Sequence, residues 1–180
     1  MNTPLHRKPR PHHRPDPSSS EQTAKGKLRR NVGLVVTDGH GHVLAGLRYH
    51  SMNNEEAWQL PQGGIDGREK PLSAAYRELK EETGLRPQQV EFVAELKDWT
   101  EYYLPEEWTK GRTFVGQKQK WFLFQYLGEG LPDLATAKHH EFSALKWVDP
   151  TWLQQHVIDF RKPVYEAVFT GFTGHLTNKG

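Results

Sequence analysis

Residues 63–85 read GGIDGREKPLSAAYRELKEETGL, and this stretch decides which fold the sequence predicts. Pro71 suits the first position of a helix, where the N–H that proline lacks has no partner in any case. Gly84 suits the position after a helix ends, because glycine readily takes a left-handed backbone. We therefore predict a helix over residues 71–83. Its predicted apolar stripe consists of Leu72, Ala75 and Leu79.

Three glutamates share one face of this predicted helix. Glu78, Glu81 and Glu82 stand at positions i, i+3 and i+4, where like charges destabilise a helix by about 0.2–0.5 kcal/mol per pair. They also lie near the C-terminus, where the helix dipole disfavours anions. One interpretation is a solvated acidic face that Arg77 and Lys80 partly compensate. The other is a divalent cation site, because Mg²⁺ and Mn²⁺ prefer carboxylate oxygens.

The residues before the helix favour the metal site. Gly63 and Gly64 allow a tight turn, so that a backbone carbonyl can approach the same ion. Glu69 lies far enough upstream to reach back to Arg77 as the helix begins. These neighbours have no role in a merely solvated acidic face.

The pattern from Gly63 to Leu85 resembles a complete Nudix box, G-x5-E-x7-R-E-U-x-E-E-x-G-U, in which U is apolar. This resemblance implies the α/β (α+β) Nudix fold, a mixed β-sheet sandwiched between helices, with the box forming a loop–helix–loop. It also implies hydrolysis of a nucleoside diphosphate linked to another moiety, with Mg²⁺ or Mn²⁺ as the cofactor.

Further segments narrow the resemblance to a subgroup. They are NVGLVV, WQLPQGGI, GQKQKWFLF, EFSALKWV and VIDFRKPVYEAVF. These segments resemble bacterial RNA pyrophosphohydrolases, and equally the asymmetric dinucleoside-polyphosphate hydrolases of plants and bacteria. The implied partner is thus an RNA 5′ end or a dinucleoside polyphosphate. Our preferred hypothesis is conversion of RNA 5′-triphosphate ends to 5′-monophosphates, and the alternative is a diadenosine tetraphosphate hydrolase. A third hypothesis, an inactive RNA- or nucleotide-binding module, is disfavoured by the intact glutamates.

The resemblance also implies roles for individual residues at the metal. The implied metal ligands are Gly63, Glu78, Glu81, Glu82 and Glu141. Glu141 stands just before FSALKWV and matches a glutamate that approaches the ion from the opposite side. The general base is either Glu78 or Glu141, and the sequence leaves this choice open. Arg77 would orient the glutamates through Glu69, or else serve only as a helical partner of Glu81.

Basic and polar residues are implied to contact the phosphates. Arg29 matches a phosphate-binding residue, Arg48 matches an arginine near the nucleotide, and Gln59 of WQLPQGG joins the substrate-binding set. The alternative for both arginines is surface solubility. Strand alternation places Lys118 and Lys120 on one side of GQKQKWF. They either meet phosphate oxygens or protect an edge strand.

Apolar and aromatic residues are implied to hold a base. Ile158 and Phe160 match such a pair, with Arg161 as a basic residue beside them. Stacking on an aromatic ring contributes about 1–3 kcal/mol per base. For Phe160 the alternative is core packing. Tyr102 or Tyr103 is a further stacking candidate, with Tyr103 placed in the predicted site and loop packing as the alternative.

The remaining chain divides into a tail and one domain. Residues 1–27 hold five of the twelve prolines and few large apolar residues, which is typical of a disordered basic tail. The domain is expected over residues 28–180. Within it we predict a hairpin around residues 38–41, a loop over 51–57 and an irregular loop over 100–116. Other predicted strands are 58–64, 90–99, 118–127 and 142–149, and other predicted helices are 150–157 and 161–172.

Composition limits the remaining possibilities. The chain has 180 residues, a net charge of +2 and no cysteine, which excludes disulfides and thiol nucleophiles. No apolar run reaches the length of about 18 residues that a membrane span needs. No apolar segment follows the basic N-terminal residues, as a secretory signal would require. We therefore expect a cytoplasmic protein that does not contact membranes, and we favour a monomer.

Overall fold

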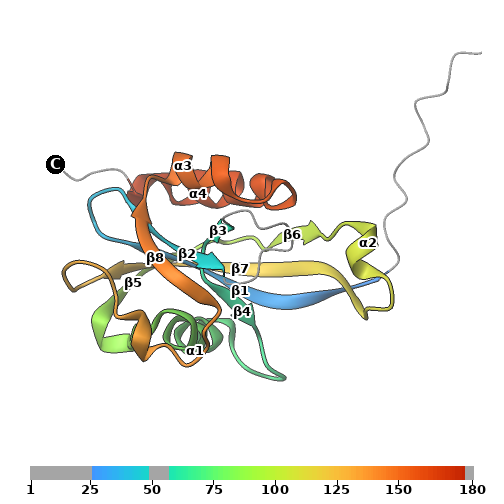
Figure 1. The fold of residues 1–180 in the computed structure, drawn as a ribbon, viewed down its shortest axis with the longest axis horizontal. Helices are drawn as coiled ribbons and strands as arrows, with labels where there is room; N and C mark the ends of the chain where they lie inside the picture. The colour runs from blue at the N-terminus through green and yellow to red at the C-terminus, as the bar shows by residue number, and fades with distance from the viewer. Residues whose placement is uncertain (1–25, 49–56, 177–180) are drawn as a thin grey trace, which may run out of the picture.

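The computed structural model describes residues 26–48 and 57–176, and the eight strands assigned there form one mixed sheet (Figure 1). The predicted disordered tail lies outside the described residues except for residues 26 and 27. The predicted loop over 51–57 lies outside them except for Ala57. No helix in the described ranges is both long and apolar enough to cross a membrane.

Strands and helices alternate along the described parts of the chain. The strands are β1 (Lys27–Thr37), β2 (Val43–Arg48), β3 (Trp58–Gln59), β4 (Gln62–Gly64), β5 (Val90–Glu95), β6 (Thr100–Tyr103), β7 (Phe114–Tyr126) and β8 (Phe142–Val148). The α-helices are α1 (Pro71–Thr83), α2 (Glu106–Thr109), α3 (Pro150–His156) and α4 (Lys162–Leu176). Short 3₁₀ turns are η1 (Pro87–Gln89), η2 (Leu134–Thr136) and η3 (Asp159–Arg161).

The two longest strands, β1 and β7, run parallel at the centre of the sheet. The main strand order is β3-β2-β1-β7-β5, with β4 paired to β1, β6 to β7 and β8 to β2. All pairs other than β1–β7 are antiparallel. The sheet is therefore mixed, as the Nudix resemblance implies.

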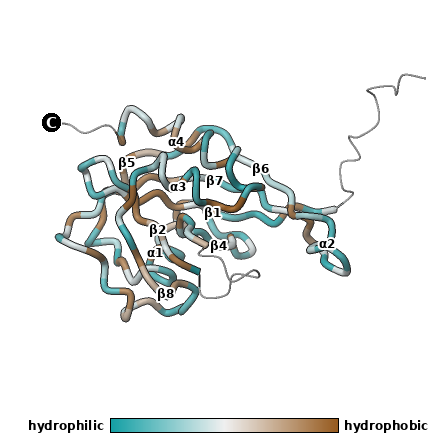
Figure 2. Tube along the Cα trace, turned by 45° about the horizontal axis from the view of Figure 1, so that its top comes forward, coloured by the Kyte–Doolittle hydropathy of each residue, from teal (hydrophilic) through white to brown (hydrophobic). Residues whose placement is uncertain are grey.

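Helices cover both faces of the sheet. Helices α3 and α4 lie on one face, at the top of Figure 1, and α1 lies on the other. Trp121 and Leu123 of β7 belong to the core under α4, whereas Phe122 and Phe124 belong to the core over α1. Because successive side chains of a strand point to opposite faces, one apolar run supplies both cores. Figure 2 shows these hydrophobic segments in the middle of the molecule.

The predicted helix is confirmed with both of its ends. α1 runs from Pro71 to Thr83, and Gly84 follows with a left-handed φ of 77° while its N–H bonds to the Lys80 carbonyl. The predicted apolar stripe is partly wrong. Leu72 is 37% exposed, and Ala74 is buried beside Ala75 and Leu79 instead. Leu72 lies in the first turn, before the helix reaches the sheet.

The hairpin is also confirmed, because β1 and β2 pair antiparallel around residues 38–41. The Asp38 N–H donates to the His42 carbonyl, and the Asp38 carboxylate accepts from the backbone N–H groups of His40 and His42. A short polar side chain that folds back on its own turn explains why this sequence forms the hairpin.

Three predicted boundaries are wrong. Residues 100–116 are not an irregular loop, since they contain β6, α2 and the start of β7. The predicted strand over 58–64 is two short strands with different partners, β2 and β1. The strand predicted to end at residue 99 ends at Glu95. β3 and β6 are only two and four residues long, and each is defined by pairing with another strand, which the local pattern does not reveal.

Candidate metal centre and substrate site

The carboxylates of α1 are packed against the glycine turn of β4. Glu78 is 7% exposed and Glu82 only 2%, so both acidic side chains are buried. A Cβ at Gly63 would overlap the Glu78 carboxylate, which means that only glycine leaves room for this group. The N–H of Gln62 donates to Glu82 Oε2 at 3.4 Å. The Glu78 and Glu82 carboxylates and the Gly63 turn thus form one acidic site, which we call the acidic hollow.

Arg77 ties the helix to the segment before it. Its Nε and Nη2 donate to the two oxygens of Glu69 at 3.0 and 2.8 Å, and Nη2 also reaches the Gly64 carbonyl at 2.8 Å. Nη1 bonds to Glu78 Oε1 at 2.7 Å and to Glu81 Oε2 at 3.0 Å. The predicted reach of Glu69 to Arg77 is confirmed, and so is the helical contact with Glu81.

Glu141 arrives at the same hollow from a distant segment. Residues 136–141 dock on the end of α1, where the His139 N–H donates to the Glu81 carbonyl at 2.8 Å. Lys138 Nζ lies 3.2 Å from Glu81 Oε1. Glu141 follows this docked segment, and its charge adds to burial in raising the pKa of Glu82. Of the predicted acidic ligands, Glu78 and Glu81 lie in one group that could hold a metal ion, and the ligand roles of Glu82 and Glu141 stay predictions.

The acidic hollow is electrostatically strained. Burial raises the pKa of Glu82 to about 9, and the neighbouring charges of Glu141 and Glu78 act in the same direction. Burial also raises the pKa of Glu78, although Arg77 opposes the shift. At Glu81 burial acts upward too, but hydrogen bonds from Lys138 and Arg77 outweigh it and lower the pKa.

These residues fit a divalent cation. The Glu78 carboxylate lies directly against Gly63, and Glu78 and Glu81 belong to a group of side chains that could hold a metal ion; hard divalent ions prefer such oxygen ligands. A positive ion would also offset the burial and the neighbouring carboxylate charges that raise the pKa of Glu82. The described residues thus contain an acidic group able to bind a divalent metal ion.

The predicted phosphate-contacting residues differ in their surroundings. The Arg29 guanidinium lies over Gly64, beside the acidic hollow, and Arg48 is exposed at the end of β2.

The two lysines of β7 differ from each other. Lys118 is exposed and forms an ion pair with Glu101 at 3.1 Å. Lys120 is buried, and its ammonium donates to the carbonyls of Leu96 and Lys97. Strand alternation is confirmed, but Lys120 is engaged by the backbone.

The predicted base-contacting residues gather in part. The Phe160 ring packs against Tyr102 with 5.4 Å between ring centroids and against Trp108 with 5.7 Å. Arg161 lies over both the Tyr102 and Phe160 rings. Ile158 is exposed nearby in the chain. Tyr103 is exposed on the opposite side of β6, so the structure brings Tyr102 to Phe160 rather than Tyr103.

Gln59 and Arg161 contact each other inside the fold. Gln59 is buried, and its Oε1 accepts from Arg161 Nη1 at 2.5 Å. Arg161 is buried too, and its Nε has no hydrogen-bond partner in the described part of the chain. This pair therefore packs against the aromatic cluster of Tyr102, Trp108 and Phe160 through Arg161.

Sequence reasoning missed a polar network on β1, β4 and β7. Gln119 Nε2 donates to Gln62 Oε1 at 2.9 Å and to Asn31 Oδ1 at 3.1 Å. Strand alternation predicts that Gln119 faces away from the lysines, but it does not reveal these partners on other strands. The available signal was the alternation of glutamine and lysine in GQKQK, because it places Gln117 and Gln119 together on the face of the strand opposite the lysines.

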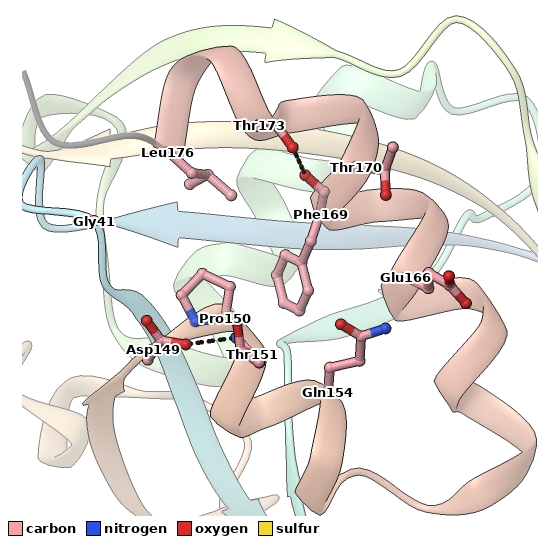
Figure 3. A pocket seen from close by; sticks show the side chains of 10 residues that line it. All are labelled: Gly41, Asp149, Pro150, Thr151, Gln154, Glu166, Phe169, Thr170, Thr173 and Leu176. Atoms are coloured by element: carbon pink, nitrogen blue, oxygen red, sulfur yellow. Dashed lines mark hydrogen bonds between the residues drawn. The ribbon is translucent and has the colours of Figure 1, made fainter.

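A separate surface pocket of about 310 Å³ lies between α3, α4 and the hairpin turn (Figure 3). The described residues that line it include Gly41, Asp149, Gln154, Glu166 and Phe169, and none of these is a predicted site residue. Asp149 is already occupied there, because its carboxylate accepts from the N–H of Thr151 and so caps α3. The pocket adds nothing to the acidic hollow.

A sandwiched mixed sheet with carboxylates on a loop–helix–loop defines the Nudix class of fold. Comparison with known families agrees, since the NUDIX domain model matches residues 27–168. The chain belongs to the NUDIX family, and the predicted family and fold are confirmed.

Similar proteins share most of the chain. An RNA pyrophosphohydrolase of Dinoroseobacter shibae is 43% identical over 153 residues, which cover 82% of this chain and 93% of the relative. An RNA pyrophosphohydrolase of Francisella tularensis subsp. mediasiatica is 40% identical over 155 residues, covering 84% and 97%.

Solved structures agree in fold at lower identity. The E. coli dihydroneopterin triphosphate pyrophosphohydrolase superposes with a TM-score of 0.62 at 18% identity, covering 78% of this chain and 97% of that one. The C. elegans Ap4A hydrolase binary complex gives a TM-score of 0.58 at 17% identity, covering 80% and 98%.

Proposed function

We propose that this chain is an RNA 5′-pyrophosphohydrolase, which converts 5′-triphosphate RNA ends to 5′-monophosphates. The observation that carries the proposal is the burial of Glu78 and Glu82 on the helix that packs against the Gly63 turn, because it builds an acidic site on the loop–helix–loop. Relatives named RNA pyrophosphohydrolase, at about 40% identity over most of the chain, support this substrate class.

The residues that would hold Mg²⁺ or Mn²⁺ are Gly63, Glu78, Glu81, Glu82 and Glu141. The bound ion would neutralise phosphate charge and lower the pKa of a bound water. Burial of Glu78 and Glu82 keeps competing water away from these carboxylates. Arg77 fixes the direction of Glu78 and Glu81, because it bonds to both of them and is itself anchored on Glu69 and the Gly64 carbonyl.

The reaction is attack of water on a phosphorus atom of the triphosphate. Glu78 or Glu141 accepts the proton of that water, a new P–O bond forms, and the anhydride P–O bond breaks. The products are a 5′-monophosphate end and pyrophosphate, or two phosphates if the groups leave in turn. A carboxylate of raised pKa suits this role, which favours Glu78, whose pKa is raised by burial.

The substrate would extend from the hollow towards the aromatic cluster. Arg29 lies beside the glycine turn, where its guanidinium can pair with phosphate oxygens. Phe160 supplies an aromatic face for an unstacked base, as single-stranded RNA requires, and the buried Arg161 packs on its ring.

A competition assay tests this proposal against the dinucleotide alternative. The full chain is incubated with Mg²⁺, 5′-triphosphate RNA and diadenosine tetraphosphate in equal amounts. We expect 5′-monophosphate RNA as the main product. Cleavage of the dinucleotide without RNA conversion would support the alternative. Binding of either substrate without turnover, under Mg²⁺ or Mn²⁺, would support an inactive binding module.

A further inference from the structure

His139 lies at the acidic hollow although it is no part of the Nudix box. One nitrogen of its ring and one oxygen each of Glu78 and Glu81 all lie within 4.8 Å of one another. His139 Nδ1 is 3.9 Å from Glu81 Oε2, and its side chain is 46% exposed. The imidazole therefore stands at the open side of the hollow, where an ion can enter.

The backbone holds this histidine in place. The His139 N–H donates to the Glu81 carbonyl, so the residue is fixed to the last turn of α1 and not free on a loop tip. Arg77 bonds to Oε1 of Glu78 and to Oε2 of Glu81, which leaves Oε2 of Glu78 for another cation and makes the Glu81 oxygen one that Arg77 would share with it. The position of the ring is thus set by the same docking that delivers Glu141.

We propose that His139 supplies a nitrogen ligand to a divalent ion shared with Glu78 and Glu81. Two ligands at about 2.1 Å from one ion lie about 3 Å apart when adjacent and about 4 Å apart when opposite. The observed 3.9 Å between His139 Nδ1 and Glu81 Oε2 falls in this range. The inference rests on the proposed metal-dependent function and adds one ligand to it.

A nitrogen ligand changes which ion the site prefers. Mg²⁺ favours oxygen ligands, whereas Mn²⁺ and later transition metals also accept imidazole. His139 therefore biases the site towards Mn²⁺. The competing explanation is that protonated His139 only pairs with the Glu81 charge, and this pairing would affect every divalent ion alike.

Electron spin-echo spectroscopy of the full chain with one equivalent of Mn²⁺ separates these explanations. We expect a directly bound nitrogen in the wild type and in the His140→Gln control, and none in His139→Gln. His140 is the exposed neighbour outside the cluster, and all three proteins keep the tail histidines. In calorimetry, His139→Gln should weaken Mn²⁺ binding about tenfold and Mg²⁺ binding less than about twofold.

Each other outcome overturns the inference in a recognisable way. Mn²⁺ binding without nitrogen coupling in the wild type, or coupling that persists in His139→Gln, removes His139 as a ligand but leaves the carboxylate site. Equal weakening of Mg²⁺ and Mn²⁺ assigns His139 to charge pairing. Absence of Mn²⁺ binding in the wild type contradicts the proposed function itself. Should His139→Gln fail to fold, His139→Asn takes its place in both measurements.

Discussion

Glu82, in the last turn of α1, is almost fully buried, and the charge of Glu141, from the segment before β8, helps burial to raise its pKa. Two carboxyl groups so placed repel each other once both are charged, and burial strengthens the repulsion. A fold that brings them together from distant segments gains no stability from the contact. The relationship is explained by a cation that both groups would bind.

Substitution of Glu82 tests this explanation. We expect Glu82→Gln to lower turnover of 5′-triphosphate RNA by about 100-fold or more, since even residues outside the ligand shell affect metal sites by about 10–100-fold. Without divalent ions its melting temperature should equal or exceed that of the wild type, because glutamine has the same volume and, unlike Glu82, needs no bound proton to be buried as a neutral group. Mg²⁺ should raise the melting temperature of the wild type but not that of Glu82→Gln.

The exposed Glu91 of β5 offers a matched control, because Glu91→Gln makes the same change away from the hollow. This variant should keep both turnover and the stabilisation by Mg²⁺. Near-normal turnover of Glu82→Gln would remove Glu82 from the ligand set.

Gly63 should tolerate no side chain. In Gly63→Ala the new Cβ would overlap the Glu78 carboxylate, so we expect weaker Mn²⁺ binding by calorimetry and slower turnover. Gly174→Ala in α4 is the control, because no atom lies within 4 Å of its Cβ and alanine favours the helix by about 0.5–1 kcal/mol. Unchanged metal binding in Gly63→Ala would show that the turn is not part of the metal centre.

The Phe160→Ala variant shows whether the Phe160 ring binds substrate or only packs in the fold. We expect Phe160→Ala to raise KM for triphosphate RNA by about tenfold, as the loss of about 1–3 kcal/mol of stacking allows, with the same Mg²⁺ requirement. Phe92→Ala, a partly exposed phenylalanine at the sheet edge, controls for general loosening. If KM stays constant while the melting temperature falls, Phe160 only packs against Tyr102 and Trp108.

The Asp38 carboxylate in the hairpin should make the free energy of unfolding depend on pH. At Asp38 burial acts to raise the pKa, but hydrogen bonds from His40 and His42 outweigh it and lower the pKa. A carboxylate with a lowered pKa stabilises the fold above the ordinary value of 3.8, and this contribution is lost as pH falls through the lowered one.

Urea unfolding measures this contribution. We expect Asp38→Ala to reduce the free energy of unfolding by about 1–2 kcal/mol at neutral pH. The difference from the wild type should shrink as pH falls below about 4. A difference that stays constant with pH would assign the effect to turn geometry and not to the charge.

The sequence predicted the helix that carries the acidic residues better than the surroundings of the proposed substrate residues. The spacing of Gly63, Arg77 and Gly84 is local, so it specified α1, its ends and the neighbouring turn. Glu141 followed from resemblance alone, because a loop residue has no periodicity. His139 was missed for the same reason.

Contacts between distant strands explain the other failures. β6 exists because Thr100–Tyr103 pairs with β7, and no short-range pattern reveals that pairing. The same pairing turns Tyr102 inward and leaves Tyr103 exposed. The burial of Lys120 and Arg161 also depends on partners far along the chain, Leu96 and Gln59. A charged residue in a strand therefore cannot be assigned to substrate from alternation alone.

Anomalous diffraction from crystals soaked in Mn²⁺ tests the central claim most directly. The acidic hollow predicts a manganese peak in contact with the carboxylates of Glu78, Glu82 and Glu141, beside the Gly63 turn. Crystals without a peak at this position, in which those side chains turn outward to water, would contradict it.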